Sequence, residues 1–399
     1  MVRFGEVPSA AVEKLLSADE AEHVSRTRRH IEAQISTAGG WIGFERYMEL
    51  ALYAPGFGYY SAGAAKIGVG GDFTTAPEVS TLFGGCIARQ CEQVLAAMPG
   101  GSILEIGAGT GRLAVDVLRR LAANRRLPER YWILEISADL RDRQRRLIAE
   151  ELPGLSTRID WLDAPPSDAF DGVIVANEVL DALPVARFVW RPDRIEEIGV
   201  TASSGGFELV PRIAHAALAA ACHKLADEVG RDWPPGYASE LSLRLGDWTG
   251  EVTRSLRCGA VLWIDYGLPR AQYYLAERSS GTLLCHFRQR AFEDPLRWPG
   301  LQDITAWVDF TALAHAAEAA GFDVAGYTTQ AYFLAGSGID AEMRALAVND
   351  RQRFALLANE ARRLMLPGEM GERFKVMAWT RRFEENLIGF EVRDFLHSL

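Results

Sequence analysis

The stretch GSILEIGAGTGR, residues 101–112, joins an acidic residue at the end of an apolar run to three glycines on alternate positions. Glu105 lies in the run, and Gly107, Gly109 and Gly111 follow it. Glycine tolerates positive φ angles and lets a ligand come close to the main chain. The spacing therefore predicts a ligand-binding turn at the point where a buried strand becomes a helix.

Two familiar phosphate-binding loops do not match this turn. The dinucleotide fingerprint GxGxxG needs a third glycine where this sequence has Arg112. A Walker loop needs a lysine after the glycines, and none is present. The pattern E-x-G-x-G-x-G instead resembles the first motif of S-adenosylmethionine methyltransferases, in which a carboxylate meets the ammonium group of the cofactor or orders a bridging water. A purely structural turn is the alternative.

The next two apolar runs also end in residues that could contact such a cofactor. RYWILEIS contains Glu135, 24 positions beyond Gly111, and an acid at the end of a second strand can accept both ribose hydroxyls. IDWL places Asp160 and Trp161 near the end of a third strand, where the adenine would lie. Glu135 could instead be a solvated surface acid, and Trp161 could be part of the core.

The fourth apolar run continues into ANEVLDALPVARF, which carries the candidate catalytic residues Asn177, Glu178 and Asp181. In an open α/β sheet, ligands bind beyond the carboxyl ends of the strands. Carboxylates can hold a guanidinium bidentately and accept the proton that leaves during methylation. Glu178 is the leading candidate for this role and Asp181 the second. The alternative is a helix N-cap formed by Asn177 or Asp181.

The loop GGDFTTAPEVS could close over the cofactor through Asp72 and Thr74. A capping box is the competing interpretation, because Thr75 stands three residues before Glu78. We therefore expect the cofactor to contact some or all of the following residues: Glu105, Gly107, Ala108, Gly109, Gly111, Glu135, Asp160, Trp161, Asp72 and Thr74.

Strand-like and helix-like stretches alternate from residue 102 onward, which predicts a mostly parallel sheet covered on both faces. Seven strands are expected, the last entering as a hairpin, as in the methyltransferase variant of the doubly wound, Rossmann-like fold. RFVWRPDRIEEIGVTASSGGFELVPR alternates with period two around a Ser-Ser-Gly-Gly turn, which predicts an antiparallel meander. We divide the chain into an N-terminal cap, the first half of the core, an α+β insertion between strands 4 and 5, and the second half of the core: 1–98, 99–185, 186–255 and 256–399.

Composition narrows the class of protein further. The chain has 399 residues, 48% of them hydrophobic, and a net charge of −10, so it lacks the basic field that drives non-specific nucleic-acid binding. It has no apolar run long enough for a transmembrane helix, and its N-terminus does not resemble a signal or transit peptide. The five cysteines are scattered and no metal-ligand spacing occurs, which favours reduced thiols, no metal site and a cytoplasmic location. The preference for arginine over lysine suggests a bacterial genome.

A set of stretches in order from about residue 41 to 380 resembles the MidA-like methyltransferases, a family that includes a mitochondrial complex I assembly factor that methylates arginine. The matching stretches are YMELALYAPGFGYYS, GDFTTAPEVSTLFG, EIGAGTGRLAVDVL, LEISADLRDRQ, ANEVLDALPV, LWIDYG, GLQDITAWVDF and MGERFKVMAW. The resemblance implies a class I methyltransferase core, S-adenosyl-L-methionine as cofactor with S-adenosyl-L-homocysteine as product, and protein arginine methylation as the reaction. Its partner would be a protein substrate such as a complex I subunit.

Three hypotheses follow. The protein could be a protein arginine methyltransferase, a methyltransferase for a small molecule, or an assembly factor that binds the cofactor without turnover. The sequence by itself does not identify the methyl acceptor or the oligomeric state.

Overall fold

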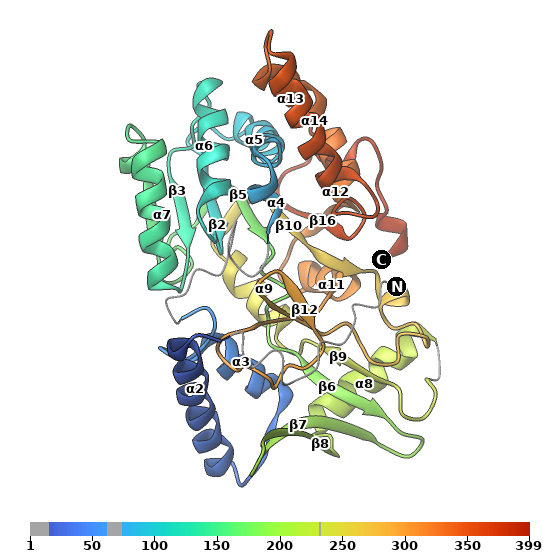
Figure 1. Ribbon diagram of the computed structural model, residues 1–399. Helices are drawn as coiled ribbons and strands as arrows, with labels where there is room; N and C mark the ends of the chain where they lie inside the picture. The colour runs from blue at the N-terminus through green and yellow to red at the C-terminus, as the bar shows by residue number, and fades with distance from the viewer. Residues whose placement is uncertain (1–15, 62–73, 231–232) are drawn as a thin grey trace.

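A mostly parallel β-sheet forms the centre of the computed structural model, which describes residues 16–61, 74–230 and 233–399 (Figure 1). Within these residues the sheet has eight strands in the order β15-β16-β10-β5-β2-β3-β4, with β14 beside β10. β16 runs antiparallel to both of its neighbours, and the other pairs are parallel. The bounds are β2 Ser102–Ile106, β3 Tyr131–Leu134, β4 Ile159–Leu162, β5 Phe170–Asn177, β10 Leu256–Leu268, β14 Val308–Asp309, β15 Asp323–Thr329 and β16 Phe374–Arg381.

Helices cover both faces of this sheet, as the continuous apolar strands require. One face packs against α5 Thr81–Ala96, α6 Arg112–Ala123, α7 Ala138–Glu151, α12 Gln330–Gly336, α13 Ile339–Leu346 and α14 Arg351–Met365. The other face packs against α9 Leu245–Thr253 and α11 Phe310–Ala319, around the edge-to-face pair Trp263 and Trp379. The fold class expected from the sequence, a class I methyltransferase-like α/β fold, is confirmed.

The insertion between β5 and β10 forms a second, antiparallel sheet in the lower half of Figure 1. Its strands are β6 Ala186–Trp190, β7 Ile195–Ser203, β8 Gly206–Ile213 and β9 Ala238–Leu241, with helix α8 Ala216–Val229. β7 and β8 form the hairpin that the Ser-Ser-Gly-Gly turn predicts. The N-terminal cap joins this sheet, because the short strand β1 Ile42–Gly43 pairs with β7.

Two helices build the rest of the cap. Helix α2 Ala18–Thr37 begins with a capping box in which Ser17 and Glu20 exchange hydrogen bonds, and it buries the apolar stripe that ends at Ile31 and Ile35. Helix α3 Phe44–Tyr53 follows β1, and helix α4 Ala76–Val79 leads back to the core. The cap therefore lies against the insertion and below the main sheet in Figure 1.

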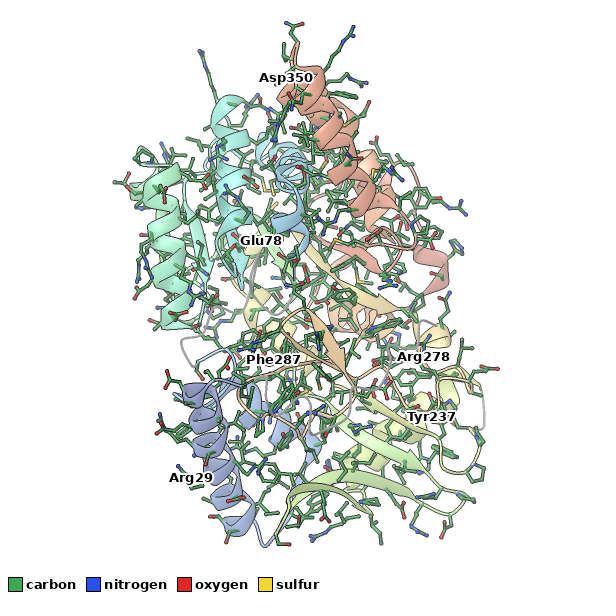
Figure 2. All side chains as sticks on the ribbon, viewed as in Figure 1. Arg29, Glu78, Tyr237, Arg278, Phe287 and Asp350 are labelled. Atoms are coloured by element: carbon green, nitrogen blue, oxygen red, sulfur yellow. The ribbon has the colours of Figure 1, made fainter. Side chains whose placement is uncertain are left out.

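A small sheet connects the cap to the second half of the core. It contains β11 Leu284–Phe287, β12 Arg290–Phe292 and β13 Asp303–Thr305, and the short helix α10 Arg270–Tyr273 precedes it. Phe287, labelled near the middle of Figure 2, packs at 4.9 Å between ring centroids against Trp298 and shares an apolar cluster with Val24 of α2. None of the helices in the described ranges is long and apolar enough to cross a membrane.

Candidate active site

A cavity of about 490 Å³ lies where the carboxyl ends of the main strands face the cap and the insertion. Its volume falls within the range of about 300–1,000 Å³ that is usual for small-molecule sites. The lining comes from the glycine loop, from the ends of β2, β3 and β5, from α3 of the cap and from α9 of the insertion. Segments far apart in the sequence therefore enclose one space.

The glycine loop adopts the backbone that its composition predicts. Gly107, Gly109 and Gly111 all have positive φ angles, of 66°, 53° and 88°. Gly111 is the N-cap of α6, and a Cβ there would come within 3.2 Å of the Gln144 side chain. A Cβ at Gly107 would approach Val179 to 3.0 Å. Ala108, between them, is buried and also lines the cavity.

Glu105 lies buried in β2 and lines the cavity beneath this loop. Its carboxylate accepts a 2.6 Å hydrogen bond from the Tyr131 hydroxyl of β3. Burial raises the pKa of Glu105 to about 7, against the lowering effect of that hydrogen bond. The carboxyl group therefore changes its charge near neutral pH, and its ionised form can pair with a cation in the cavity.

Glu135 follows β3 and is held from two sides. Its Oε1 accepts a hydrogen bond from the backbone N–H of Ser137 at 3.0 Å. Its Oε2 accepts a hydrogen bond from the side-chain amide of Gln144 at 3.2 Å. The same Gln144 amide also donates to the carbonyl of Gly109 at 2.9 Å. Burial raises the pKa of Glu135. Gln144, which the sequence analysis did not single out, therefore couples the acid of the second strand to the glycine loop.

The structure does not bring Asp160 and Trp161 into the lining of the cavity. Asp160 is exposed and faces Arg130 at 3.4 Å, because it lies within β4 and not at its end. Trp161 packs against the core, and its indole N–H donates to Gln144 at 2.9 Å, so it supports the site from behind. The residues from this region that reach the lining follow β4 directly: Asp163, Ala164 and Pro165.

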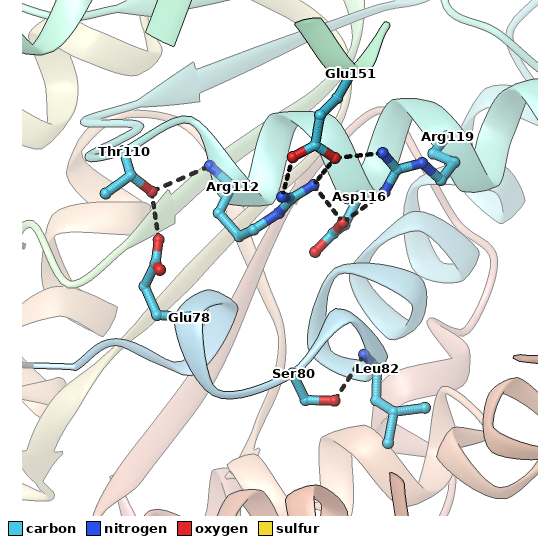
Figure 3. A network of polar contacts seen from close by, with 8 residues as sticks. All are labelled: Glu78, Ser80, Leu82, Thr110, Arg112, Asp116, Arg119 and Glu151. Carbon is cyan, nitrogen blue, oxygen red and sulfur yellow. Dashed lines mark hydrogen bonds and ion pairs between the residues drawn. The ribbon is translucent and has the colours of Figure 1, made fainter. Parts of the chain in front are cut away.

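The segment before α5 contacts the glycine loop directly. The Glu78 carboxylate accepts a hydrogen bond from the Thr110 hydroxyl, as Figure 3 shows. Thr75 is the N-cap of α4, but its side chain makes no capping hydrogen bond, so the capping box that was the competing interpretation is absent there. Thr75 lines the cavity, whereas Thr74 does not. Asp72 lies outside the described residues.

Arg112 occupies the position where a dinucleotide fingerprint has its third glycine. Its guanidinium binds Glu151 of α7 through two contacts, at 2.7 and 3.0 Å, and Asp116 at 2.9 Å (Figure 3). Arg119 joins the same network through Glu151 and Asp116. The pKa of Glu151 is lowered to about 2, mainly by its hydrogen bond from Arg112. This ion-pair network fixes α6 against α7 and thereby the floor of the cavity.

Glu178 is presented to the cavity by an unusual backbone conformation. Asn177 is the last residue of β5, and Glu178 follows it with a positive φ of 55°, which costs of order 1–3 kcal/mol for a residue with a side chain. The Glu178 carboxylate accepts a hydrogen bond from the Asn177 amide at 3.1 Å. Burial, together with the charge of Asp265, raises the pKa of Glu178 to about 8.

Asp265, near the end of β10, stabilises this turn. Its Oδ2 accepts the backbone N–H groups of Val179, Leu180 and Asp181 at 3.1, 2.8 and 3.3 Å. No helix begins here in the structure, so the alternative role of Asn177 or Asp181 as a helix N-cap is excluded. Strand pairing places Ile264 of β10 opposite Asn177, which explains why the next residue, Asp265, reaches the turn.

Asp181 is buried and lies outside the lining of the cavity. Its backbone carbonyl accepts the N–H of Ala306 at 2.9 Å, which ties the turn to the second half of the core. Burial and the nearby carboxylates of Asp265 and Asp303 raise its pKa well above the ordinary value. The structure thus separates the two acids that the sequence places together, because only Glu178 faces the cavity.

The cap supplies cavity residues that the sequence analysis missed, among them Tyr53 and Tyr60. The chain turns back after α3, and the backbone N–H of Tyr60 donates to the carbonyl of Leu52 at 2.8 Å. The two rings therefore lie 5.5 Å apart between centroids with an angle of 20° between their planes. The only sequence signal was the high tyrosine content of YAPGFGYY.

Comparison with known proteins identifies the family. Residues 86–328 match a family model described as "Putative S-adenosyl-L-methionine-dependent methyltransferase". The chain belongs to this methyltransferase family. A crystal structure of a "likely methyl transferase" from Burkholderia thailandensis bound to S-adenosyl-homocysteine is 42% identical, with a TM-score of 0.91 over 96% of this chain and 99% of the other. A native structure from the same organism is 40% identical, with a TM-score of 0.88 over the same shares.

Curated relatives cover nearly the whole methyltransferase. Protein arginine methyltransferase NDUFAF7, mitochondrial, from Danio rerio is 27% identical over 379 residues, which span 87% of this chain and 85% of the relative. Its homolog from Caenorhabditis elegans is 27% identical over 90% of this chain and 87% of its own length. The protein is therefore an S-adenosyl-L-methionine-dependent methyltransferase.

The residues of the cavity fit the cofactor that the family uses. The ammonium and ribose hydroxyls of S-adenosyl-L-methionine are hydrogen-bond donors, and the lining offers the acidic side chains of Glu105 and Glu135 at the ends of adjacent strands. The glycine loop between them exposes backbone where side chains are absent. The lining also includes residues of α3 and α9, apart from those that fit the cofactor.

Proposed function

We propose that this methyltransferase methylates an arginine side chain of a protein substrate. The observation that carries the proposal is Glu178, a carboxyl group that a left-handed backbone turn presents to the cavity and whose pKa lies at about 8. The curated relatives, which are named protein arginine methyltransferases, support the choice of arginine.

Glu178 has the chemistry that an arginine acceptor needs. A guanidinium remains protonated at neutral pH and is a poor nucleophile, so a carboxylate must orient it and take its proton. Glu178 would hold one guanidinium nitrogen through its Oε atoms and accept the proton that this nitrogen loses. An incoming cation favours the ionised carboxylate, which would lower the pKa of Glu178 as the substrate binds. Asp181, buried outside the cavity lining, would act on the turn and not on the substrate.

Other residues of the lining would hold the cofactor. Glu135 would accept the ribose hydroxyls, Glu105 would face the ammonium group, and the backbone from Gly107 to Gly111 would lie beside the amino-acid portion. When bound, S-adenosyl-L-methionine supplies a methyl group on a positively charged sulfur. The cap helix α3 and the insertion helix α9 also line the cavity and would exclude water from the space between the cofactor and Glu178.

The proposal is tested by incubating the wild-type protein with isotope-labelled S-adenosyl-L-methionine and a lysate from cells that lack it, followed by mass spectrometry for methylated arginine. Glu178→Gln should lose about 10²–10⁴-fold of this activity while it still binds S-adenosyl-L-homocysteine. Glu150→Gln, an exposed change in α7, is the matched control. A label found on a small molecule, or cofactor binding without transfer to any acceptor, would contradict the proposal.

We further propose that the substrate is a subunit of respiratory complex I or of its bacterial counterpart, as the family resemblance implies. The reaction would take place in the cytoplasm. The five cysteines of the chain are all free thiols, four of them buried, which is consistent with a reducing compartment. Recovery of the labelled arginine in a complex I subunit would support this assignment, and its recovery only in unrelated proteins would overturn it.

A further inference from the structure

The hydroxyl groups of Tyr53 and Tyr60 both donate their protons to hydrogen bonds within the protein. The Tyr53 hydroxyl donates to the backbone carbonyl of Ala182 at 2.9 Å, and the Tyr60 hydroxyl donates to Oδ1 of Asp303 at 3.0 Å. A tyrosine hydroxyl has only one proton to donate. A group in the cavity that reaches either oxygen must therefore be a donor, because the oxygen can only accept.

The surroundings of these two rings help to keep both hydroxyl oxygens as acceptors. Asp303 is buried, and Ala182 lies in the turn that follows Glu178 and also lines the cavity. Burial and the charge of Asp303 raise the pKa of both tyrosines well above the ordinary value, so both keep their protons in the range where the protein functions. The hydrogen bonds to Ala182 and Asp303 consequently persist at neutral pH.

The acceptors that line the cavity come from separate parts of the chain. Glu178 follows β5, whereas Tyr53 and Tyr60 belong to the cap. The two rings lie nearly parallel, with 5.5 Å between their centroids. A guanidinium is planar, carries five N–H donors and has no acceptor. A carboxamide or a urea of similar shape has a carbonyl oxygen in place of one nitrogen, so it offers fewer N–H donors to the tyrosine oxygens and Glu178.

We propose that Tyr53 and Tyr60 are specificity-determining residues that make the cavity select a guanidinium over groups that carry a carbonyl oxygen, such as the side chains of glutamine and citrulline. The inference rests on the proposed function, since it assigns the acceptor chemistry of the same site. It adds the cap to the recognition of the substrate, a role that the core residues alone do not explain.

The test measures binding of two small probes, N-acetyl-arginine methylamide and N-acetyl-citrulline methylamide, to the full-length protein saturated with S-adenosyl-L-homocysteine. Isothermal calorimetry should give an affinity about tenfold or more higher for the arginine probe with the wild type, as expected for hydrogen bonds to a charged donor. Tyr60→Phe and Tyr53→Phe should each reduce this ratio severalfold, and the double variant should bring it close to one. Tyr332→Phe, in α12, is the control and should leave the ratio unchanged.

Binding of S-adenosyl-L-homocysteine and the thermal midpoint show whether each variant is folded. Equal binding of both probes to the wild type, no binding of the arginine probe, or an unchanged ratio in the folded double variant would overturn the inference. A separate assay of methyl transfer to protein arginine distinguishes the two proposals. If the wild type selects the arginine probe but transfers no methyl group to arginine, the proposed function fails while the selectivity stands.

Discussion

Asp265 accepts the backbone N–H groups of the three residues that follow Glu178, at 2.8 to 3.3 Å, and so holds Glu178 in a left-handed conformation at the edge of the cavity. Asp265 lies in β10, and Glu178 directly follows the neighbouring parallel strand β5. Their charges interact, and the proximity of Asp265 contributes to the raised pKa of Glu178. One carboxylate therefore helps to position the other and, after burial, is the second cause of its raised pKa.

Asp265→Asn should impair catalysis without changing affinity for the cofactor. If the asparagine amide nitrogen faces the turn, it cannot accept the N–H groups of residues 179–181, and a buried unsatisfied donor costs about 1–3 kcal/mol. We expect the free energy of unfolding to fall by this amount and kcat for arginine methylation to fall about tenfold or more. Calorimetry with S-adenosyl-L-homocysteine and denaturant unfolding separate the two effects.

Asp171→Asn provides the matched control for this substitution. Asp171 lies at the opposite end of β5 and pairs with Arg257 at the surface, where such pairs contribute about 0–1 kcal/mol. It should leave kcat unchanged. An Asp265→Asn variant with normal kcat would show that the turn does not depend on this carboxylate.

The rate of methylation should rise with pH. The pKa of Glu178 is raised to about 8, and a general base must lose its proton before it can accept another. The value of kcat/KM should therefore increase about tenfold per pH unit below pH 8 and become constant above it. The profile of kcat itself should be displaced to lower pH, because a bound guanidinium stabilises the carboxylate. A flat profile of kcat/KM between pH 6 and 9 would argue against Glu178 as the base.

The stability of the cofactor-free protein should change with pH in the opposite direction. The pKa of Glu105 is raised by burial from 4.5 to about 7, so the native state keeps a proton that the unfolded state has released. The resulting stabilisation is complete below about pH 4.5 and is lost as pH rises through 7, on the order of 3 kcal/mol in total. Glu105→Gln can still accept the Tyr131 hydroxyl but does not ionise. The thermal midpoint of the wild type should therefore fall relative to this variant between pH 5 and 8, and parallel curves would contradict the assignment.

Glu135→Ala should weaken binding of S-adenosyl-L-homocysteine by about tenfold to a hundredfold, as expected when hydrogen bonds to a charged group are lost. Asp160→Asn should leave the affinity unchanged, since Asp160 is exposed and does not line the cavity. Titration calorimetry of both variants checks the pair. A large loss with Asp160→Asn would show that the third strand contributes to the site through a residue that the geometry places outside it.

Most of the residues proposed to bind the cofactor could be predicted from the sequence, because short local stretches determine their positions. The positive φ angles of the glycine loop, the buried acid of β2 and the acid after β3 follow from a few residues at the ends of apolar runs. A strand that carries such residues must deliver them to the same edge of a parallel sheet. The sequence misplaced the contact of the third strand by a few residues, since strand ends are poorly defined by periodicity, and Asp163 lines the cavity where Asp160 was expected.

The residues proposed to bind the methyl acceptor are positioned by contacts between segments far apart in the sequence. Only the tertiary structure shows which of them reach the cavity. The sequence placed Glu178 and Asp181 three residues apart, as the first and second candidates for the catalytic base, but the hydrogen bonds from the turn to Asp265 leave one exposed to the cavity and the other buried. The Tyr60 hydroxyl can act only as an acceptor toward the cavity because it donates its proton to Asp303, 243 residues away. Side chains at a strand end are positioned by local backbone geometry, whereas the direction of a hydroxyl proton is set by whichever acceptor the fold brings beside it.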